Sequence, residues 1–182
     1  MNTTKVMLAH SLLLFVLDYA DASYLRLTED QLNKLERLQN LAIRFMFGLR
    51  KYDHVSEFLQ KLKWFPVRRR RDLHVLSFLY CVLFNPKTPP YLKEKFNVVG
   101  TASDLRSSRM LTLSMQFHKT KFYKLSFAVQ AIELWNVLPT NIRQAKSLNM
   151  FKNTVKALSL ALAFILRNKT TGFYFFSIYS LI

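Results

Sequence analysis

The stretch TEDQLNKLERLQNLAIRFMFGL (residues 28–49) indicates the fold more clearly than any other part of the chain. It opens on a capping box, in which Thr28 and Gln31 each accept a hydrogen bond from the other's backbone N–H at a helix start. Its apolar residues recur at steps of three and four, the spacing of one helix face. Gly48 suits the helix end, because glycine readily adopts the left-handed conformation found there. These features predict a helix over residues 28–49.

The flanking segments continue the helical pattern, and prolines mark its breaks. We expect a helix to start near Pro66 and to end at Asn85, because proline disfavours helical geometry in the residue before it. Residues 5–17 are apolar but too short for a bilayer, which needs about 20 residues, and are interpreted as a helix. Asp53 is a candidate cap for a helix at 54–62. Further helices are expected around 123–137 and 147–166, with a short one ending near Phe96.

Residues 97–121 lack sustained periodicity and mix serine, threonine and basic residues, so we expect an irregular connector there, with room for a short hairpin near 110–117. The chain has only three glycines, which favours long helices over a many-turned β protein. The expected fold is therefore all-α: an irregular bundle of about six or seven helices with a loose basic connector.

The positive charge of the chain is large and unevenly placed. The formal net charge is +16, and residues 51–182 carry twenty-one Lys/Arg but only six Asp/Glu. Such a field attracts polyanions over long distances and makes their binding dependent on salt. Nucleic acid is the expected partner; a membrane surface, a ribosome-like partner and a merely solvated basic surface are the alternatives.

A run of four arginines is the strongest local signal for phosphate binding. Their side chains point around a whole helix turn, near a helix N-terminus that disfavours cations. Guanidinium groups bind phosphate oxygens bidentately, so nucleic-acid phosphate would compensate this placement. Pairing with acidic neighbours, of which only Asp72 is close in sequence, and a nuclear-targeting signal are the other interpretations. The run is Arg68, Arg69, Arg70 and Arg71, extended upstream by Lys61 and Lys63.

Two aromatic residues and a second basic cluster complete the candidate interface. Trp64 and Tyr52 flank the arginine run and could stack on unpaired bases, although an aromatic near a helix start is more often part of the core. The second cluster lies mainly in the connector, where flexible basic segments often become ordered on RNA; a plain solvated loop is the alternative. Its members are Arg106, Arg109, Lys119, Lys121 and Lys124.

Catalytic and metal chemistry have little support in the sequence. Cys81 is alone, so neither a disulfide nor a zinc knuckle can form within the chain. The four histidines are scattered, without acidic or thiol residues at metal-ligand spacing, and no Ser-His-Asp trio can be assembled. We expect no metal, no cofactor and no small-molecule substrate.

Several short phrases, taken in order over about residues 10–157, resemble the region that follows the polymerase core in reverse transcriptases of non-LTR (LINE-type, jockey-like) retrotransposons. The phrases are LDY (17–19) with Asp21, LERLQN (35–40), RKYDHV (50–55), LKWFPVR (62–68), TPPYL (88–92), LRSS (105–108), SFA (126–128), LWN (134–136), LP (138–139), IR (142–143), Ser147 and FK (151–152). Residues 158–182 match nothing in that family.

The resemblance implies a division of the chain into a thumb-like helical segment (1–50), a basic helical segment (51–96), the connector (97–121), C-terminal helices (122–166) and an aromatic tail (167–182). It also implies that the palm carboxylates and endonuclease are absent, since Ala22 stands where a second palm carboxylate belongs. Residues 19–22 are interpreted as an ordinary helix end. We therefore expect a non-enzymatic fragment that binds RNA or DNA backbone, as in target-primed reverse transcription.

The same resemblance predicts that the helix at 28–49 keeps an exposed face, against which the missing polymerase core would pack. Two alternatives remain. One is a translated retroelement remnant without activity. The other is a secreted or membrane-surface basic protein, because residues 5–22 imitate a signal peptide. An intracellular location, nuclear included, is favoured over secretion.

Overall fold

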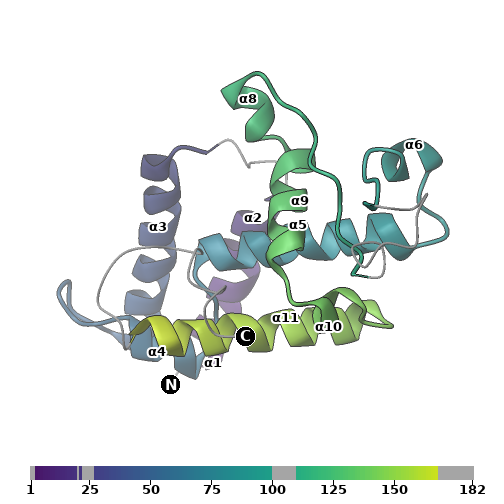
Figure 1. The fold of residues 1–182 in the computed structure, drawn as a ribbon. Coiled ribbons are helices and arrows are strands. Elements are labelled where there is room, and N and C mark those ends of the chain that lie inside the picture. Colours follow the sequence, from purple (N-terminus) through teal and green to yellow (C-terminus); the bar gives the residue numbers. More distant parts are fainter. Residues whose placement is uncertain (1–2, 20, 22–26, 100–109, 168–182) are drawn as a thin grey trace.

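The computed structural model describes residues 3–19, 21, 27–99 and 110–167, with side chains up to residue 159. This part of the chain is helical and contains no sheet, so the all-α prediction is confirmed. Figure 1 shows α5 (Val67–Phe84) across the middle of the molecule, with α11 (Leu148–Arg167) beside it. The upright α3 (Glu29–Phe47) and α9 (Phe127–Val137) also pack on α5, which makes α5 the central helix.

The N-terminal residues form one continuous helical rod with a wide turn in its middle. It comprises α1 (Thr3–Leu8), the π-helical η1 (Ala9–Leu14) and α2 (Phe15–Asp18), which confirms the helix predicted over 5–17. The rod packs on both α3 and α5. Within the described residues, no helix is both long and apolar enough to cross a bilayer.

The predicted capping box is present at the start of α3. The Thr28 N–H donates to Gln31 Oε1 at 2.9 Å, and Thr28 Oγ1 accepts from the Gln31 N–H at 3.4 Å. Gly48 ends the helix with a φ of 66°, in the left-handed region where a side chain would be strained. Both ends of α3 are therefore set by local sequence chemistry.

Other boundaries differ from the predictions. Asp53 does not cap α4 (Ser56–Lys61); its Oδ2 accepts from the Arg50 N–H at 2.7 Å and closes a turn instead. The helix expected over 123–137 is two helices, α8 (Lys121–Lys124) and α9, because the chain leaves helical geometry at Leu125 and Ser126. The single-turn helices α6 (Pro90–Lys93) and α10 (Thr140–Arg143) bring the number of helical segments above the expected six or seven.

The connector is less loose than expected where it is described. It has no hairpin at 110–117; instead Val98 forms an antiparallel bridge with Leu113. The Asn136 side chain of α9 holds this pairing, because its amide accepts from the Leu113 N–H and donates to the Leu113 carbonyl, both at 2.9 Å. Leu113 is consequently 1% exposed and belongs to the core.

Two apolar clusters hold the helices together. The larger lies between α5, α9, α10 and α11 and is built around aromatic rings: Trp135 and Phe151 are fully buried, with centroids 5.7 Å apart, and Tyr80 stacks on Phe151 at 4.7 Å. The smaller packs the N-terminal rod and α4 against α3, around Ile43, Met46 and Val55. The two clusters position the basic residues considered next.

Candidate nucleic-acid interface

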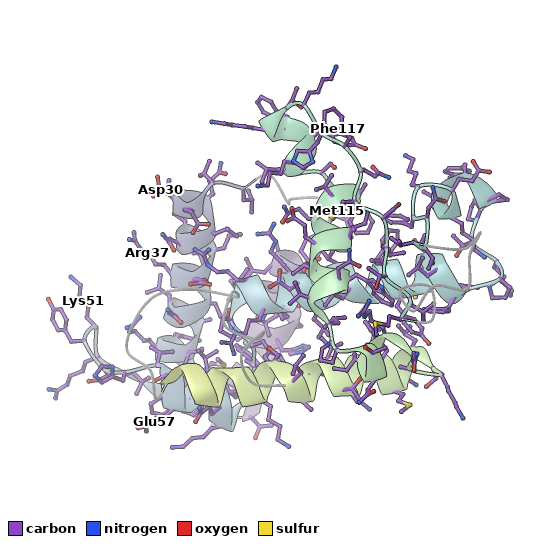
Figure 2. All side chains as sticks on the ribbon, viewed as in Figure 1. Asp30, Arg37, Lys51, Glu57, Met115 and Phe117 are labelled. Carbon is purple, nitrogen blue, oxygen red and sulfur yellow. The ribbon has the colours of Figure 1, made fainter. Side chains whose placement is uncertain are left out.

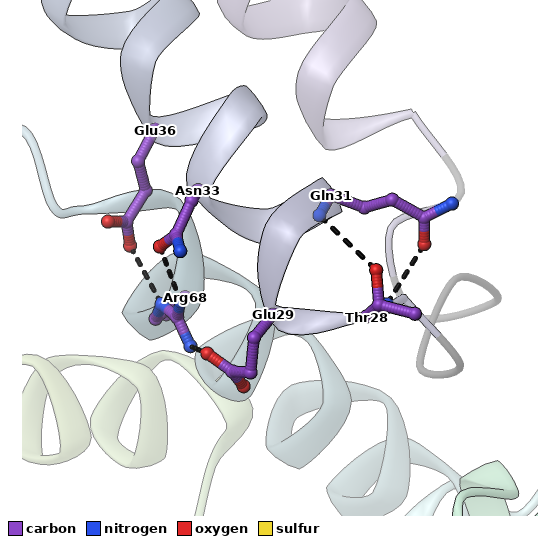
Figure 3. A network of polar contacts seen from close by, with 6 residues as sticks. All are labelled: Thr28, Glu29, Gln31, Asn33, Glu36 and Arg68. Carbon is purple, nitrogen blue, oxygen red and sulfur yellow. Dashed lines mark hydrogen bonds and ion pairs between the residues drawn. The ribbon is translucent and has the colours of Figure 1, made fainter.

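Arg68 is held by three partners on α3 (Figure 3). Its Nη1 donates to Glu29 Oε2 at 2.7 Å, Nε to Glu36 Oε1 at 3.2 Å, and Nη2 to Asn33 Oδ1 at 3.0 Å. The hydrogen bond to Glu29, reinforced by the charge of both carboxylates, raises the pKa of Arg68. The whole guanidinium fork is therefore engaged within the chain.

The other three arginines also have positions inside the bundle. Arg69 Nη1 donates to the Ser159 carbonyl of α11 at 3.1 Å, and Arg70 Nε donates to Asp18 Oδ1 at 2.6 Å. Arg71 is 7% exposed, and its burial lowers the pKa of its guanidinium. Pairing with acidic residues, one of the alternatives left open by the sequence, therefore occurs through carboxylates that are 32 to 52 positions away in the sequence. Direct nucleic-acid binding by the run stays a prediction, which this geometry does not favour.

Asp72, the acidic residue that follows the arginine run, is buried in a way that disfavours its charged form. Burial raises the pKa of Asp72 to about 6, against the opposing pull of Arg71, Arg69 and Arg68. The folded chain therefore holds the Asp72 proton more tightly than the unfolded chain does. Stability must then decrease as the pH rises between the unfolded value of 3.8 and the folded value of about 6.

This sign gives a testable expectation for Asp72→Asn. At neutral pH the variant should be more stable than the parent by up to about 3 kcal/mol, because it removes a carboxylate whose ionisation destabilises the fold. Below pH about 4 the two proteins should be equally stable, since the carboxyl is protonated in both states. Urea denaturation at a series of pH values measures this. A variant that is less stable at neutral pH would show that the arginines hold an ionised Asp72.

The structure brings together Asp18, Asp21 and His74, which the sequence separates. Asp21 is 5% exposed, and its Oδ2 lies 2.5 Å from His74 Nδ1. One ligand atom from each of the three residues lies within 4.8 Å of the others. Folding therefore gives His74 acidic neighbours that spacing in the sequence did not indicate. However, Arg70 already binds Asp18, and its positive charge disfavours a divalent cation there. We interpret the cluster as the polar clamp that holds the N-terminal rod on α5.

The lysines and aromatics beside the arginine run differ in accessibility. Lys61 and Lys63 are exposed, as a phosphate-binding role requires. Tyr52 is 86% exposed, and the Lys51 ammonium lies 5.5 Å from its ring centroid. Trp64 is half-buried against the smaller apolar cluster. The stacking prediction is therefore easier to accommodate at Tyr52 than at Trp64.

A second basic site, here called the 117–124 segment, lies on α8 and the residues before it. Lys119, Lys121 and Lys124, all three members of the predicted second cluster, are exposed. None of them forms an ion pair with a carboxylate in the described part of the chain. Figure 1 shows α8 beyond the end of α9 that is farthest from α11, and Figure 2 shows Phe117 at that extremity. Arg106 and Arg109 lie outside the described residues.

Aromatic side chains alternate with these lysines. Phe117 is 84% exposed, Phe122 71% and Tyr123 41%. Three hydrogen bonds anchor the segment. Within it, Thr120 Oγ1 accepts from the Tyr123 N–H at 3.2 Å, and the Tyr123 hydroxyl donates to Gln116 Oε1. Gln116 Nε2 in turn donates to the Lys95 carbonyl at 2.6 Å. Sequence reasoning missed these aromatics, although the alternation in KTKFYK (119–124) was the available signal.

No protein-family model, curated protein or solved structure matches the chain. The resemblance to retrotransposon reverse transcriptases stays a prediction. What the chain does must therefore be inferred from its own surface chemistry.

Proposed function

We propose that the chain binds single-stranded nucleic acid through the 117–124 segment, as a non-catalytic C-terminal part of a retrotransposon reverse transcriptase. The observation that carries the proposal is the alternation of unpaired, exposed lysines with exposed aromatic rings on one anchored projection. Lysines that track a backbone and aromatics that stack on bases are the combination that binds single strands with little sequence choice.

Two physical effects act together in this binding. Each lysine that approaches a phosphate releases condensed counterions, which gives affinity that decreases with salt. Each base stacked on an aromatic ring adds about 1–3 kcal/mol. The net charge of +16 supplies the long-range attraction that brings a polyanion to the segment.

An exposed apolar face supports the proposal that the chain is part of a larger protein. On α3, Leu38, Leu41 and Phe45 are 46–65% exposed, and on the adjacent N-terminal rod several large apolar side chains are 51–69% exposed. Contiguous apolar surface of this kind marks a site of protein contact. In the proposed parent, the polymerase core would cover it. The exposed rod residues are Met7, Leu8, Leu12, Phe15, Val16 and Tyr19.

The proposal is tested with a triple variant, Lys119→Ala/Lys121→Ala/Lys124→Ala. Its Kd for a labelled, unstructured oligouridylate, measured by fluorescence anisotropy near 100 mM salt, should rise by about 10- to 100-fold, because three phosphate contacts are lost. The matched control, Lys34→Ala/Lys87→Ala/Lys146→Ala, removes three exposed lysines from elsewhere. It should change Kd by less than about threefold, since it alters only the long-range field.

Equal losses of affinity in the two triple variants would contradict the proposal, because binding would then depend on net charge alone. Failure of the parent chain to bind the oligonucleotide more tightly than about 1 mM would also contradict it, and would favour an inactive remnant.

A further inference from the structure

A pocket of about 310 Å³ lies where the N-terminal rod, the 63–65 stretch, α5 and α11 meet. It is separate from the 117–124 segment, which contributes none of its lining. Four basic side chains line it: Lys63, Arg70, Lys152 and Lys156. Asp18 is the only carboxylate among the lining residues, and Arg70 already binds it at 2.6 Å. The pocket therefore carries a positive charge that no group in its wall neutralises.

Three of these basic residues reach the pocket from two segments, α11 and the 63–65 stretch. Lys152 and Lys156 are four residues apart on α11 and so project from the same helix face. Lys63 has a φ of 54°, a left-handed conformation that is costly for a residue with a side chain. Strain at a single residue often marks a functional position. Here it accompanies a lysine that lines the pocket.

Arg70 adds to the positive charge of the pocket wall. Its side chain is 10% exposed, and only its Nε has a partner, Asp18. The terminal nitrogens, Nη1 and Nη2, are buried and make no hydrogen bond in the described part of the chain. Buried donors are nearly always satisfied, because leaving them unpaired is costly. Both nitrogens are closed to solvent, so Arg70 contributes its positive charge to the pocket rather than hydrogen bonds to an oxyanion.

The volume of the pocket and its aromatic lining residues limit which anions it can bind. Inorganic phosphate fills only a small part of the pocket, whose volume is at the lower end of the roughly 300–1,000 Å³ of small-molecule sites. The wall also includes Trp64, Phe65 and His10, whose ring lies 6.4 Å from that of Trp64. An aromatic wall beside a cationic one fits a planar base attached to a phosphate.

We infer that this pocket binds a nucleoside monophosphate, with the phosphate held by Lys152 and Lys156, near the positive charge of Arg70, and the base against Trp64. The nucleotide can be free or can be the 5′-phosphorylated end of a strand, since both present the same chemistry. The sequence indicated Lys63, Trp64 and Arg70 as candidate binding residues but not Lys152 and Lys156, which lie about 80 positions further along the chain.

Tryptophan fluorescence provides a direct measurement. The chain has two tryptophans, and Trp135 is fully buried, so a ligand-dependent change reports on Trp64. Adenosine 5′-monophosphate should change the emission with a Kd of about 10–100 μM. Lys152→Ala/Lys156→Ala should raise this Kd by about 10-fold or more, because it removes two charged contacts to the phosphate. The matched control is Lys87→Ala/Lys146→Ala, two exposed lysines outside the pocket, which should leave the Kd unchanged.

Adenosine, which lacks the phosphate, should bind at least about 10-fold more weakly. Equal binding of adenosine and the monophosphate, equal effects of the two double variants, or no emission change up to about 1 mM would each overturn the inference. A 5′-phosphorylated oligonucleotide that competes, while its unphosphorylated form does not, supports a strand end as the source. Competition by neither supports a free nucleotide. The triple variant of the 117–124 segment should keep its affinity for the monophosphate, so this site and the proposed function can fail separately.

Discussion

Replacing Arg70 with alanine is expected to lower the free energy of unfolding by about 3 kcal/mol. Arg70 joins the N-terminal rod to α5 through its 2.6 Å bond to Asp18, and its side chain is only 10% exposed. The truncation leaves Asp18 without its partner and empties the space that the arginine stem fills. Urea denaturation followed by far-ultraviolet circular dichroism measures the change.

The matched control is Arg37→Ala, because Arg37 is an exposed arginine on α3; it should change stability by less than about 0.5 kcal/mol. A double-mutant cycle with Asp18→Ala isolates the pair, since the double variant should be more stable than the sum of the two single changes predicts. An Arg70→Ala protein as stable as the Arg37→Ala protein would show that Arg70 has no structural role.

Trp135→Ala should have the largest effect on the fold, a loss of about 4 kcal/mol. The side chain is 0% exposed, stacks near Phe151 with centroids 5.7 Å apart, and donates from Nε1 to the Leu111 carbonyl at 2.8 Å. The substitution opens a cavity at the centre of the larger cluster and removes one of the hydrogen bonds that hold the connector on α9. Thermal and urea unfolding both report the loss.

Phe117→Ala is the matched aromatic control, because Phe117 is 84% exposed and should contribute less than about 0.5 kcal/mol to stability. The stability of Trp135→Phe should lie between those of Trp135→Ala and Phe117→Ala, because it keeps an aromatic ring in the core but removes the hydrogen bond to Leu111. A Trp135→Ala protein with nearly the stability of the parent would contradict the assignment of this helix to the core.

Features that depend on neighbouring residues could be predicted from the sequence. The capping box at Thr28 and Gln31, the glycine end of α3 and the proline-bounded α5 each follow from contacts within a few positions. The pairing of Val98 with Leu113 could not be predicted, because it depends on the packing of distant segments. Asn136 holds that pairing from 23 residues away.

In the candidate site, too, local features could be predicted from the sequence and contacts between distant residues could not. The four arginines were an obvious local signal, but their carboxylate partners on α2 and α3 are remote in sequence, so the demand for an external phosphate was overestimated. Lys119 and Lys121 were predicted from composition, whereas the exposure of Phe117 beside them depends on where α8 lies relative to the bundle. Convergence of Asp18 and Asp21 on His74 likewise needs the three-dimensional fold.

The salt dependence of single-strand binding tests the central proposal most directly. Log Kd for the oligouridylate should be measured over a series of salt concentrations for the parent, for the 117–124 triple variant and for its matched control. If the three lysines contact phosphates, the slope against log salt should fall by about 2 in the triple variant, since each contact with a single strand contributes about 0.7. The control should keep the parent slope. Equal slopes for the two triple variants would contradict the assignment of the nucleic-acid contact to the 117–124 segment.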